Sequence, residues 1–332
     1  MFENLIQVLK DNPRKIVLAD KADPRVLEAA ARLKKDGFLS PILIGNVDEM
    51  KAAAAEGGFD IDGIEILDPA TFEDMPKMVE TMVELRKGKM TAEECADLLK
   101  TNNYFGTMLV KLGYADALLG GATYSTADTI RPALQIIKTK KGANLVSSSF
   151  VMVKGDEILT MGDCAVNISY EDKKDKEGNV TLTAAAQLAE VAVETAKTAK
   201  AFGVEPKVAM LSYSTKGSGK GANVDLVRNA TAIAKEMAPD LAIDGEMQFD
   251  AAVSPEVGQL KFPGSPVAGY ANTFVFPEIQ SGNIGYKIAA RLGGYAAFGP
   301  ILQGLNAPIN DLSRGCNAEE IYQMSIITAA LA

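Results

Sequence analysis

The 332-residue chain contains no histidine. This absence excludes a Ser-His-Asp triad, a Cys-His catalytic pair and any metal site built on histidine ligands. If the chain is an enzyme, its acid–base chemistry must come from carboxylates, lysine, tyrosine or the substrate itself.

Cysteine is scarce, and long apolar runs are absent. Cys95, Cys164 and Cys316 are far apart and odd in number, which indicates reduced thiols in the cytoplasm rather than a disulfide framework or a zinc cluster. No apolar run approaches the roughly 20 residues that span a bilayer, and the first residues lack the order of a signal peptide. We therefore expect a cytoplasmic protein with no membrane partner.

Positive charge is also in deficit. The chain has 34 Lys and Arg against 43 Asp and Glu, a net charge of −9. This balance argues against nucleic acid or an anionic membrane as a partner. A protein of this charge that binds an anionic ligand must concentrate its arginines locally, so the position of each arginine is informative.

Apolar residues, at 47% of the chain, are plentiful and alternate with amphipathic segments. This alternation predicts an α/β fold with a parallel sheet and right-handed crossovers, and the length suits two domains. Among the expected elements are strands at 15–20, 40–45, 64–67 and 116–121, and helices at 24–35 and 47–56.

The pattern changes at Asn144. Strands are predicted at 144–153, 157–162 and 165–170, the first two joined by the hairpin signal Lys154-Gly155-Asp156. A domain boundary is therefore expected near residue 143. Further along, we expect helices at 181–202 and 285–297 and strands at 207–212 and 273–276.

Three clusters of glycine, hydroxyl and basic residues lie between a predicted strand and a predicted helix. They are GGATYST (120–126), STKGSGKG (214–221) and NDLSRG (310–315). Free backbone N–H groups, hydroxyls and a guanidinium in such turns suit an anion. The second cluster fails the spacing of an ATP-binding P-loop because Ala222, rather than Ser or Thr, follows its last Lys-Gly pair.

Segments 123–132, 212–219 and 308–315 together resemble the phosphate acetyl/butyryltransferase family, and the similarity covers essentially the whole chain. The resemblance implies reversible acetyl transfer between coenzyme A and inorganic phosphate, with acetyl phosphate as the other product. It also implies a homodimer of two α/β domains with a cleft between them, similar to the isocitrate/isopropylmalate dehydrogenases. The expected domains are 1–143 plus 297–332, and 144–296, with coenzyme A as substrate, no tightly bound cofactor and no metal.

The same resemblance assigns catalytic roles. Arg291 and Arg314 would hold the phosphoryl group, and Ser313 would hydrogen-bond the reacting carbonyl or sulfur. The position of the family's aspartate base is Glu320 in this chain, and it would accept the proton of the coenzyme A thiol before direct attack in a ternary complex. Glu320 also has a structural interpretation, since Asn317 and Glu320 have the spacing of a capping box.

Coenzyme A would be bound by Arg86 and Arg131, which match the arginines that engage its 3′-phosphate and pyrophosphate. The remaining residues expected to line the cleft or contact substrate are Ser125, Thr126, Ser214, Thr215, Lys216, Asn310 and Asp311. An acyl-cysteine at Cys316 is the less favoured route because the sequence arranges no base for it.

Three other functions compete with this one. A phosphate butyryltransferase would share the loops and differ in the acyl group. A metal- and NADP-dependent decarboxylating dehydrogenase on the same fold would need a dinucleotide loop, yet no G-x-G-x-x-G follows a strand near the start of either half. An acyl-CoA sensor without catalysis would not need the phosphate-binding residues Arg291, Ser313 and Arg314.

Overall fold

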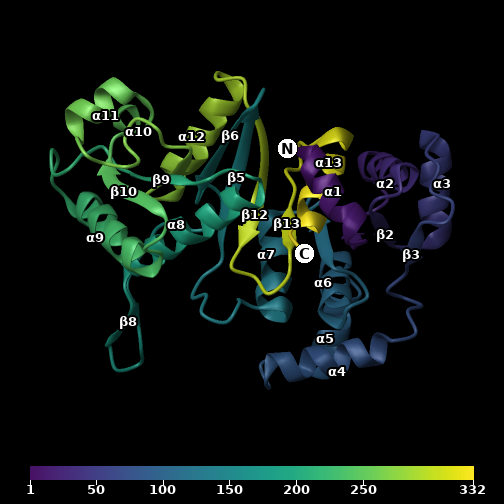
Figure 1. The fold of residues 1–332 in the computed structure, drawn as a ribbon. Helices are drawn as coiled ribbons and strands as arrows, with labels where there is room; N and C mark the ends of the chain where they lie inside the picture. The colour runs from purple at the N-terminus through teal and green to yellow at the C-terminus, as the bar shows by residue number, and fades with distance from the viewer. The chain divides into compact units, whose positions relative to one another are not determined.

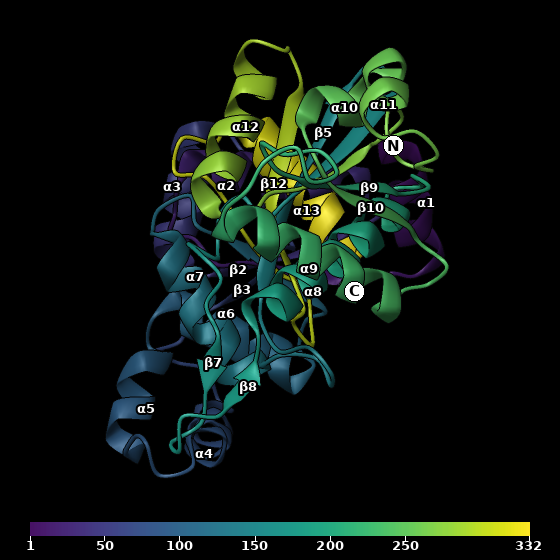
Figure 2. The ribbon, with the colours of Figure 1, turned by 90° about the vertical axis from the view of Figure 1, so that its left-hand side faces the viewer.

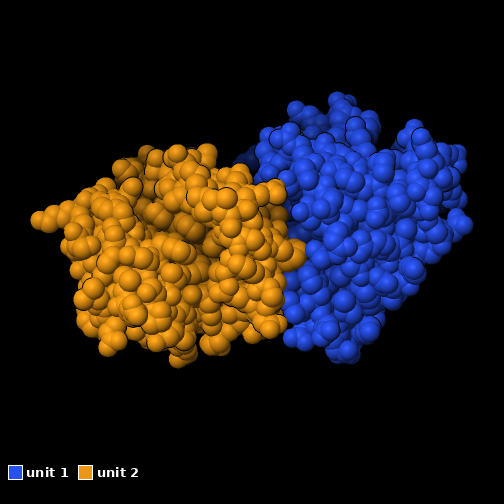
Figure 3. Space-filling view, turned by 90° about the horizontal axis from the view of Figure 1, so that it is seen from above, with its two compact units in different colours: residues 1–140, 305–332 blue, residues 141–304 orange.

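The structure is a computed structural model that describes residues 1–332, drawn in Figure 1 and, turned by 90°, in Figure 2. It divides into two compact units, coloured separately in Figure 3. Unit 1 comprises Met1–Lys140 and Leu305–Ala332, and unit 2 comprises Lys141–Gly304.

Unit 1 is built on a five-stranded parallel sheet in the order β13-β4-β1-β2-β3, which confirms the predicted α/β class with a parallel sheet. The strands β1, β2 and β4 are apolar and largely buried, as parallel strands covered on both faces must be. They are β1 (Lys15–Leu18), β2 (Ser40–Ile44), β3 (Glu65–Leu67), β4 (Ala117–Gly120) and β13 (Ile309–Asp311).

Helices cover both faces of this sheet. Helices α1, α2 and α13 pack together over β1, β2 and β4, and α6 packs on β1 and β4 from the other side (Figure 1). The helices of unit 1 are α1 (Phe2–Asp11), α2 (Pro24–Asp36), α3 (Val47–Gly57), α4 (Met75–Arg86), α5 (Ala92–Leu99), α6 (Asn102–Leu112), α7 (Thr126–Pro132), the π-helix η1 (Ala133–Ile137) and α13 (Ala318–Ala330).

Helix α6 has no counterpart among the predicted elements. Most of its residues are buried, and its N-cap Thr101 makes no side-chain capping bond, so it carries neither an amphipathic period nor a start signal. Gly106 lets the helix lie close to the sheet: a Cβ there would come within 3.0 Å of side-chain atoms of Val17, Ile44 and Leu118. The reason for this glycine is tertiary packing.

Unit 2 contains a six-stranded sheet in the order β10-β9-β11-β6-β5-β12. The first four are parallel, whereas β5 runs antiparallel to both neighbours, as the hairpin signal at 154–156 predicted. The strands are β5 (Ser147–Lys154), β6 (Glu157–Gly162), β9 (Lys207–Leu211), β10 (Ala242–Met247), β11 (Thr273–Val275) and β12 (Ala296–Gln303). Strand β12 runs through residue 297, where the sequence places a domain boundary, and its pairing with β5 keeps the chain in unit 2 as far as Gly304.

The prediction of a strand at 165–170 is wrong. The buried carboxylate of Asp163 accepts hydrogen bonds from the backbone N–H groups of Ala165, Val166 and Asn167 at 2.9–3.2 Å, which hold this segment in a series of bends. A local side-chain acceptor has replaced the neighbouring strand.

The helices of unit 2 pack on both faces of its sheet. Helices α8 and α9 cover one face, and α12 packs against β5, β6 and β12 through Tyr286, which stacks on Phe150. They are α8 (Ala184–Ala201), α9 (Ala222–Met237), α10 (Phe249–Val253), α11 (Pro255–Lys261) and α12 (Ile279–Arg291). Helix α12 begins earlier than the predicted 285–297 because Glu278 caps it.

A two-stranded hairpin leaves the body of unit 2. Its strands β7 (Lys173–Lys174) and β8 (Val180–Leu182) extend away from α8 (Figure 2). None of the helices in either unit combines the length and apolar character required to cross a membrane.

Candidate active site

The carboxyl ends of β1, β4 and β13 bring three loops of unit 1 to one edge of its sheet. The register pairs Leu18 with Leu119 and Gly120 with Asp311, so the residues that follow each strand are neighbours. The loop after β1 carries Asp20, the loop after β4 carries Thr123, and the loop after β13 carries Ser313 and Arg314. Ligands of open α/β sheets bind at this edge.

Asp20 ties the first of these loops to the second. Its buried carboxylate accepts hydrogen bonds from the backbone N–H and the hydroxyl of Thr123, at 2.7 and 2.6 Å. Burial raises the pKa of Asp20, and the two bonds from Thr123 oppose that rise. The GGATYST turn is therefore held by a carboxylate that the sequence analysis did not single out.

Asp311 ties the third loop to α7. Its carboxylate oxygens accept hydrogen bonds from the hydroxyls of Thr126 and Thr129, both at 2.6 Å. Burial raises the pKa of Asp311 to about 6, against the opposing effect of these hydroxyls. The predicted contact residues Thr126 and Asp311 thus meet each other, and Asp311 fixes the loop rather than facing solvent.

Asn310 and Ser125 also support the loops. The buried Asn310 amide donates to the hydroxyl of Thr328 on α13 at 3.0 Å. The Ser125 hydroxyl donates to Asp128 at 2.7 Å at the start of α7. Both predicted residues lie beside the loops that carry Thr123 and Ser313, and both side chains make structural hydrogen bonds.

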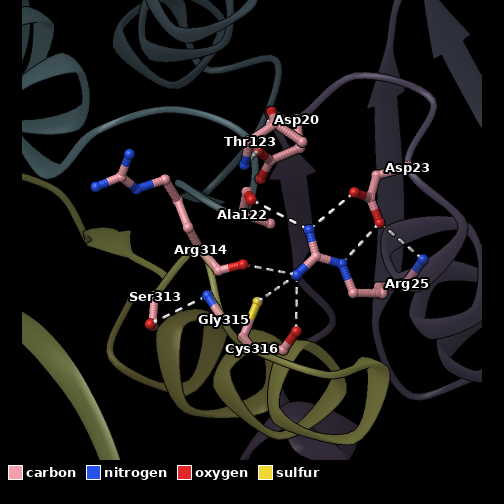
Figure 4. A network of polar contacts seen from close by, with 9 residues as sticks. All are labelled: Asp20, Asp23, Arg25, Ala122, Thr123, Ser313, Arg314, Gly315 and Cys316. Atoms are coloured by element: carbon pink, nitrogen blue, oxygen red, sulfur yellow. Dashed lines mark hydrogen bonds and ion pairs between the residues drawn. The ribbon is translucent and has the colours of Figure 1, made fainter.

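Arg25 holds the Ser313–Cys316 loop in place (Figure 4). Its Nη1 donates to the carbonyl oxygens of Arg314 and Cys316 at 2.9 and 2.8 Å, and its Nη2 donates to the carbonyl oxygen of Ala122 at 3.1 Å. Asp23 in turn accepts from the guanidinium at 2.8 and 2.9 Å, which fixes the position of the Arg25 side chain. One side chain therefore connects all three loops.

Arg25 was not identified as important from the sequence alone, although its position in the chain indicates that its charge needs a partner. The residue lies in the first turn of α2, where a positive charge opposes the helix dipole. A cation in that position needs a compensating partner, and here the partners are Asp23 and the carbonyl oxygens of Arg314 and Cys316.

Ser313 and Arg314 are exposed on the loop that Arg25 fixes. The Ser313 hydroxyl accepts a weak hydrogen bond from the Gly315 N–H at 3.3 Å, and Arg314 forms no ion pair. In Figure 4 the Arg314 guanidinium extends away from Arg25. A hydroxyl and an unpaired guanidinium on a braced loop provide the hydrogen-bond donors that a phosphoryl or acyl oxygen requires.

Glu320 forms the predicted capping box with Asn317. Its Oε2 accepts from the Asn317 N–H at 3.0 Å, and its own N–H donates to Asn317 Oδ1 at 2.9 Å. Only Oε2 takes part in the cap, and the side chain is exposed. The capping interpretation is therefore correct for the structure, and it leaves Oε1 available.

Cys316 is the last residue of the Ser313–Cys316 loop, and its side chain is buried. Burial raises the pKa of its thiol to about 11, and the positive charge of Arg25 only partly opposes this. A thiol with that pKa is almost entirely protonated near neutral pH and is a poor nucleophile.

Arg86 and Arg131 both act electrostatically on Tyr104. The Tyr104 hydroxyl donates to Gln135 at 3.0 Å, burial raises its pKa, and the charges of Arg131 and Arg86 partly oppose that rise. Arg131 is exposed on α7, and Arg86 is half-buried at the end of α4, with its Nε 3.2 Å from the Met90 sulfur. Both arginines predicted to bind coenzyme A belong to unit 1, and their shared role stays a prediction.

In unit 2, the STKGSGKG loop binds the carboxylate of a side chain of the protein itself. The Glu246 carboxylate accepts from the Gly217 N–H at 2.8 Å and from the Ser214 hydroxyl at 2.9 Å. Burial raises the pKa of Glu246, but these hydrogen bonds and that of Arg228 outweigh it and lower the pKa. The loop does form a cradle, made by the Gly217 N–H and the Ser214 hydroxyl, and a buried carboxylate occupies it.

The other predicted residues of unit 2 differ in exposure. Thr215 is buried and accepts from the Gln248 N–H at 2.9 Å, whereas Lys216 is exposed with its ammonium 5.0 Å from the Phe262 ring centre. Arg291 is the last residue of α12, exposed and without an ion pair. In the whole chain, no group of three or more Cys, Asp or Glu side chains is arranged to hold a metal ion.

Known proteins are similar to this chain over nearly its whole length. A phosphate acetyltransferase of Staphylococcus epidermidis is 52% identical to it over 99% of both chains, and one of Bacillus subtilis is 51% identical over 100% of this chain and 99% of its own. A phosphotransacetylase structure from Streptococcus pyogenes matches with a TM-score of 0.92 and 52% identity, over 99% of this chain and 97% of that one. The EutD phosphotransacetylase structure from Staphylococcus aureus matches with a TM-score of 0.86 and 50% identity, over 99% and 98%.

A family model described as phosphate acetyl/butaryl transferase matches residues 1–329, nearly the entire sequence. The three loops on which the sequence resemblance rests all lie within this range. The chain therefore belongs to the phosphate acetyl/butaryl transferase family.

Proposed function

We propose that this chain is an acyltransferase that moves an acetyl group reversibly between coenzyme A and inorganic phosphate. The observation that carries the proposal is the braced loop of unit 1, which exposes Ser313 and Arg314 at the carboxyl edge of a parallel sheet. Relatives about half identical in sequence over their full length are named phosphate acetyltransferases.

In the proposed reaction, the sulfur of the coenzyme A thiolate attacks the carbonyl carbon of acetyl phosphate. A C–S bond forms, the C–O bond to phosphate breaks, and inorganic phosphate leaves with the electron pair. No acyl-enzyme is formed, in keeping with the high pKa of the Cys316 thiol. Catalysis then depends on positioning and on stabilising charge at the phosphoryl and carbonyl oxygens.

Glu320 is the proposed base for the thiol proton. A free thiol has a pKa of about 8.5 and is mostly protonated at neutral pH, so a carboxylate that accepts the proton as the sulfur attacks would assist the reaction. The capping bond uses Oε2 and fixes the carboxyl group on the first turn of α13, four residues beyond Cys316. Oε1 is the oxygen that would take the proton.

We further propose that the phosphoryl group is held by Arg314 and Arg291. Both guanidiniums are exposed and neither has an ionic partner, so each is available to a phosphate. Ser313 would hydrogen-bond the carbonyl or sulfur, and Lys216 would add a positive charge from the STKGSGKG loop. A fold similar to the isocitrate/isopropylmalate dehydrogenases is part of this proposal.

Coenzyme A would be bound through its phosphates by Arg86 and Arg131. These two arginines are on the same unit as Ser313 and Arg314, and the charge of each opposes the rise that burial causes in the pKa of Tyr104. A pair of guanidiniums suits the 3′-phosphate and pyrophosphate because each presents a planar set of donors. No tightly bound cofactor enters the proposed reaction.

We propose a cytoplasmic homodimer that pairs through α12. Ile284, Ile288 and Leu292 are spaced four residues apart and are 58, 53 and 85% exposed, which forms an apolar stripe along one side of the helix. Ile288→Asp should convert the dimer to a monomer in light scattering. An unchanged mass for this variant would contradict pairing through α12.

The function is tested by a substrate panel. Acetyl-, propionyl- and butyryl-CoA are supplied with and without phosphate, and the thiol of released coenzyme A is followed. The proposal predicts phosphate-dependent release that is fastest with acetyl-CoA. Fastest release with butyryl-CoA would identify a butyryltransferase, and release without phosphate, or none at all, would overturn the proposal.

A further inference from the structure

Unit 1 contains a pocket that the proposed reaction does not use. It has a volume of about 890 Å³ and lies at the carboxyl ends of β1, β2 and β3, where Lys21, Gly45 and Asp68 follow the strands. This volume falls within the range of about 300 to 1,000 Å³ that is typical of small-molecule sites. None of the residues that line it has a role in acetyl transfer.

Positive charge enters the pocket from two lysines. Lys21, on the β1–α2 loop, forms no ion pair, and Lys100 follows α5, where it contacts Asp97 at 2.7 Å. The adjacent start of α2 is closed to an anion, because Asp23 caps it and Pro24 has no N–H. A phosphate in this pocket would therefore be bound by lysine ammonium groups and not by a helix terminus.

Two carboxylates line the pocket beyond the ends of β2 and β3. Asp68 is already engaged, since it accepts from the Ala70 N–H at 2.9 Å and from the Asn46 amide at 3.4 Å. Glu49, in the first turn of α3 after β2, makes no side-chain hydrogen bond or ion pair. A carboxylate without a partner can accept hydrogen bonds from the hydroxyls of a ribose.

The remaining wall is apolar. Met50, Met75 and Pro69 line it together with Ile44, and Met50 and Pro69 are buried. Methionine side chains adapt to a flat ring and make favourable sulfur–aromatic contacts. Apolar area therefore lies next to the carboxylates and lysines, and a ligand that fills the pocket needs an aromatic part, a diol and an anionic part.

We propose that this pocket binds a purine ribonucleoside monophosphate. The phosphate contacts Lys21 and Lys100, the ribose hydroxyls donate to Glu49, and the base packs on Met50 and Met75. Two molecules carry this combination of phosphate, ribose and purine: a free nucleotide, and coenzyme A at its nucleotide end.

Calorimetric titration of the full-length chain with AMP tests the proposal without an activity readout. We expect saturable binding, weaker by about tenfold for adenosine, which lacks the phosphate, and for 2′-deoxy-AMP, which lacks one of the hydroxyls for Glu49. Lys21→Ala should lower the affinity for AMP by about tenfold. Ala96→Phe, which fills the pocket, should abolish AMP binding. Lys111→Ala, an exposed lysine at the far end of α6, is the matched control and should bind AMP as the wild type does.

Repeating the AMP titration with coenzyme A at saturation separates the two sources. Retained AMP binding assigns the pocket to a free nucleotide, and lost binding assigns it to the nucleotide end of coenzyme A. Absence of saturable AMP binding overturns the proposal, as does unchanged affinity in Lys21→Ala. Because Lys21 is exposed, that variant keeps the test valid even where Ala96→Phe fails to fold.

Discussion

Arg25 donates hydrogen bonds to the carbonyl oxygens of both Arg314 and Cys316, at 2.9 and 2.8 Å, across nearly the whole length of the chain. The guanidinium thus fixes the backbone on either side of Gly315 while the side chains of Ser313 and Arg314 stay free. A lysine could not make both bonds and also contact Ala122, since it lacks the planar arrangement of donors.

Arg25→Ala should therefore lower turnover by about 100-fold, because a shift of an ångström in a catalytic loop has an effect of that size. Arg25→Lys should lie between this variant and the wild type. Turnover would be measured at saturating substrates, with melting temperature as the control for folding. Turnover of Arg25→Ala within about twofold of the wild type would show that the loop needs no bracing.

Asp311 predicts a pH dependence of stability. Burial raises its pKa from 3.8 to about 6, so the folded state prefers the protonated carboxyl. The stability that Asp311 contributes is complete below about pH 4 and is lost as the pH rises through about 6. Asp311→Asn stays neutral. As the pH rises from about 4 to about 6, its free energy of unfolding should therefore increase by roughly 2 to 3 kcal/mol relative to that of the wild type.

Urea unfolding of Asp311→Asn and wild type across this range measures the difference. Asp240→Asn, which removes an exposed carboxylate, is the control and should give a difference that does not change with pH. A flat difference for Asp311→Asn as well would mean that the carboxylate is ionised in the folded state throughout.

Cys316 should be dispensable. Its thiol is buried with a pKa of about 11, so Cys316→Ala should retain turnover within about threefold of the wild type. Intact mass spectrometry after incubation with acetyl phosphate alone should detect no added acetyl group. A stable acetyl adduct that disappears in Cys316→Ala would replace direct attack by an acyl-enzyme route.

Glu320 can be tested apart from its capping role because glutamine also completes a capping box. Glu320→Gln should keep the melting temperature and lose about 100-fold in turnover, within the usual range for a general base. Glu319→Gln, on the same helical turn and paired with Arg32, is the matched control and should retain turnover. A loss under about tenfold for Glu320→Gln would reduce Glu320 to a cap.

Local signals in the sequence predicted much of unit 1. The helix predicted at 24–35 begins at Pro24 in the structure, and the spacing of Asn317 and Glu320 predicted a capping box that the structure contains. These features depend on residues within one turn of each other, so the sequence determines them without tertiary context.

Long-range contacts account for what the sequence could not predict. Arg25 acts on residues almost 300 positions away, and Glu246 occupies the Ser214–Gly217 cradle from another strand. Helix α6 was missed because burial on all sides removes the amphipathic pattern. Residues 165–170 have the composition of a strand, but a single buried carboxylate, Asp163, takes the hydrogen bonds that a strand would have made.

The central proposal is that Arg291 and Arg314 bind the same phosphoryl group. A double-mutant cycle on kcat/KM for phosphate, with Arg291→Ala, Arg314→Ala and the double variant, tests it most directly. Residues that share a ligand are coupled by about 0.5 to 3 kcal/mol, so the double variant should lose clearly less than the product of the two single losses. If the loss in the double variant equals the product of the two single losses, to within a free energy of about 0.3 to 0.5 kcal/mol, the two arginines act at independent sites and the account is contradicted.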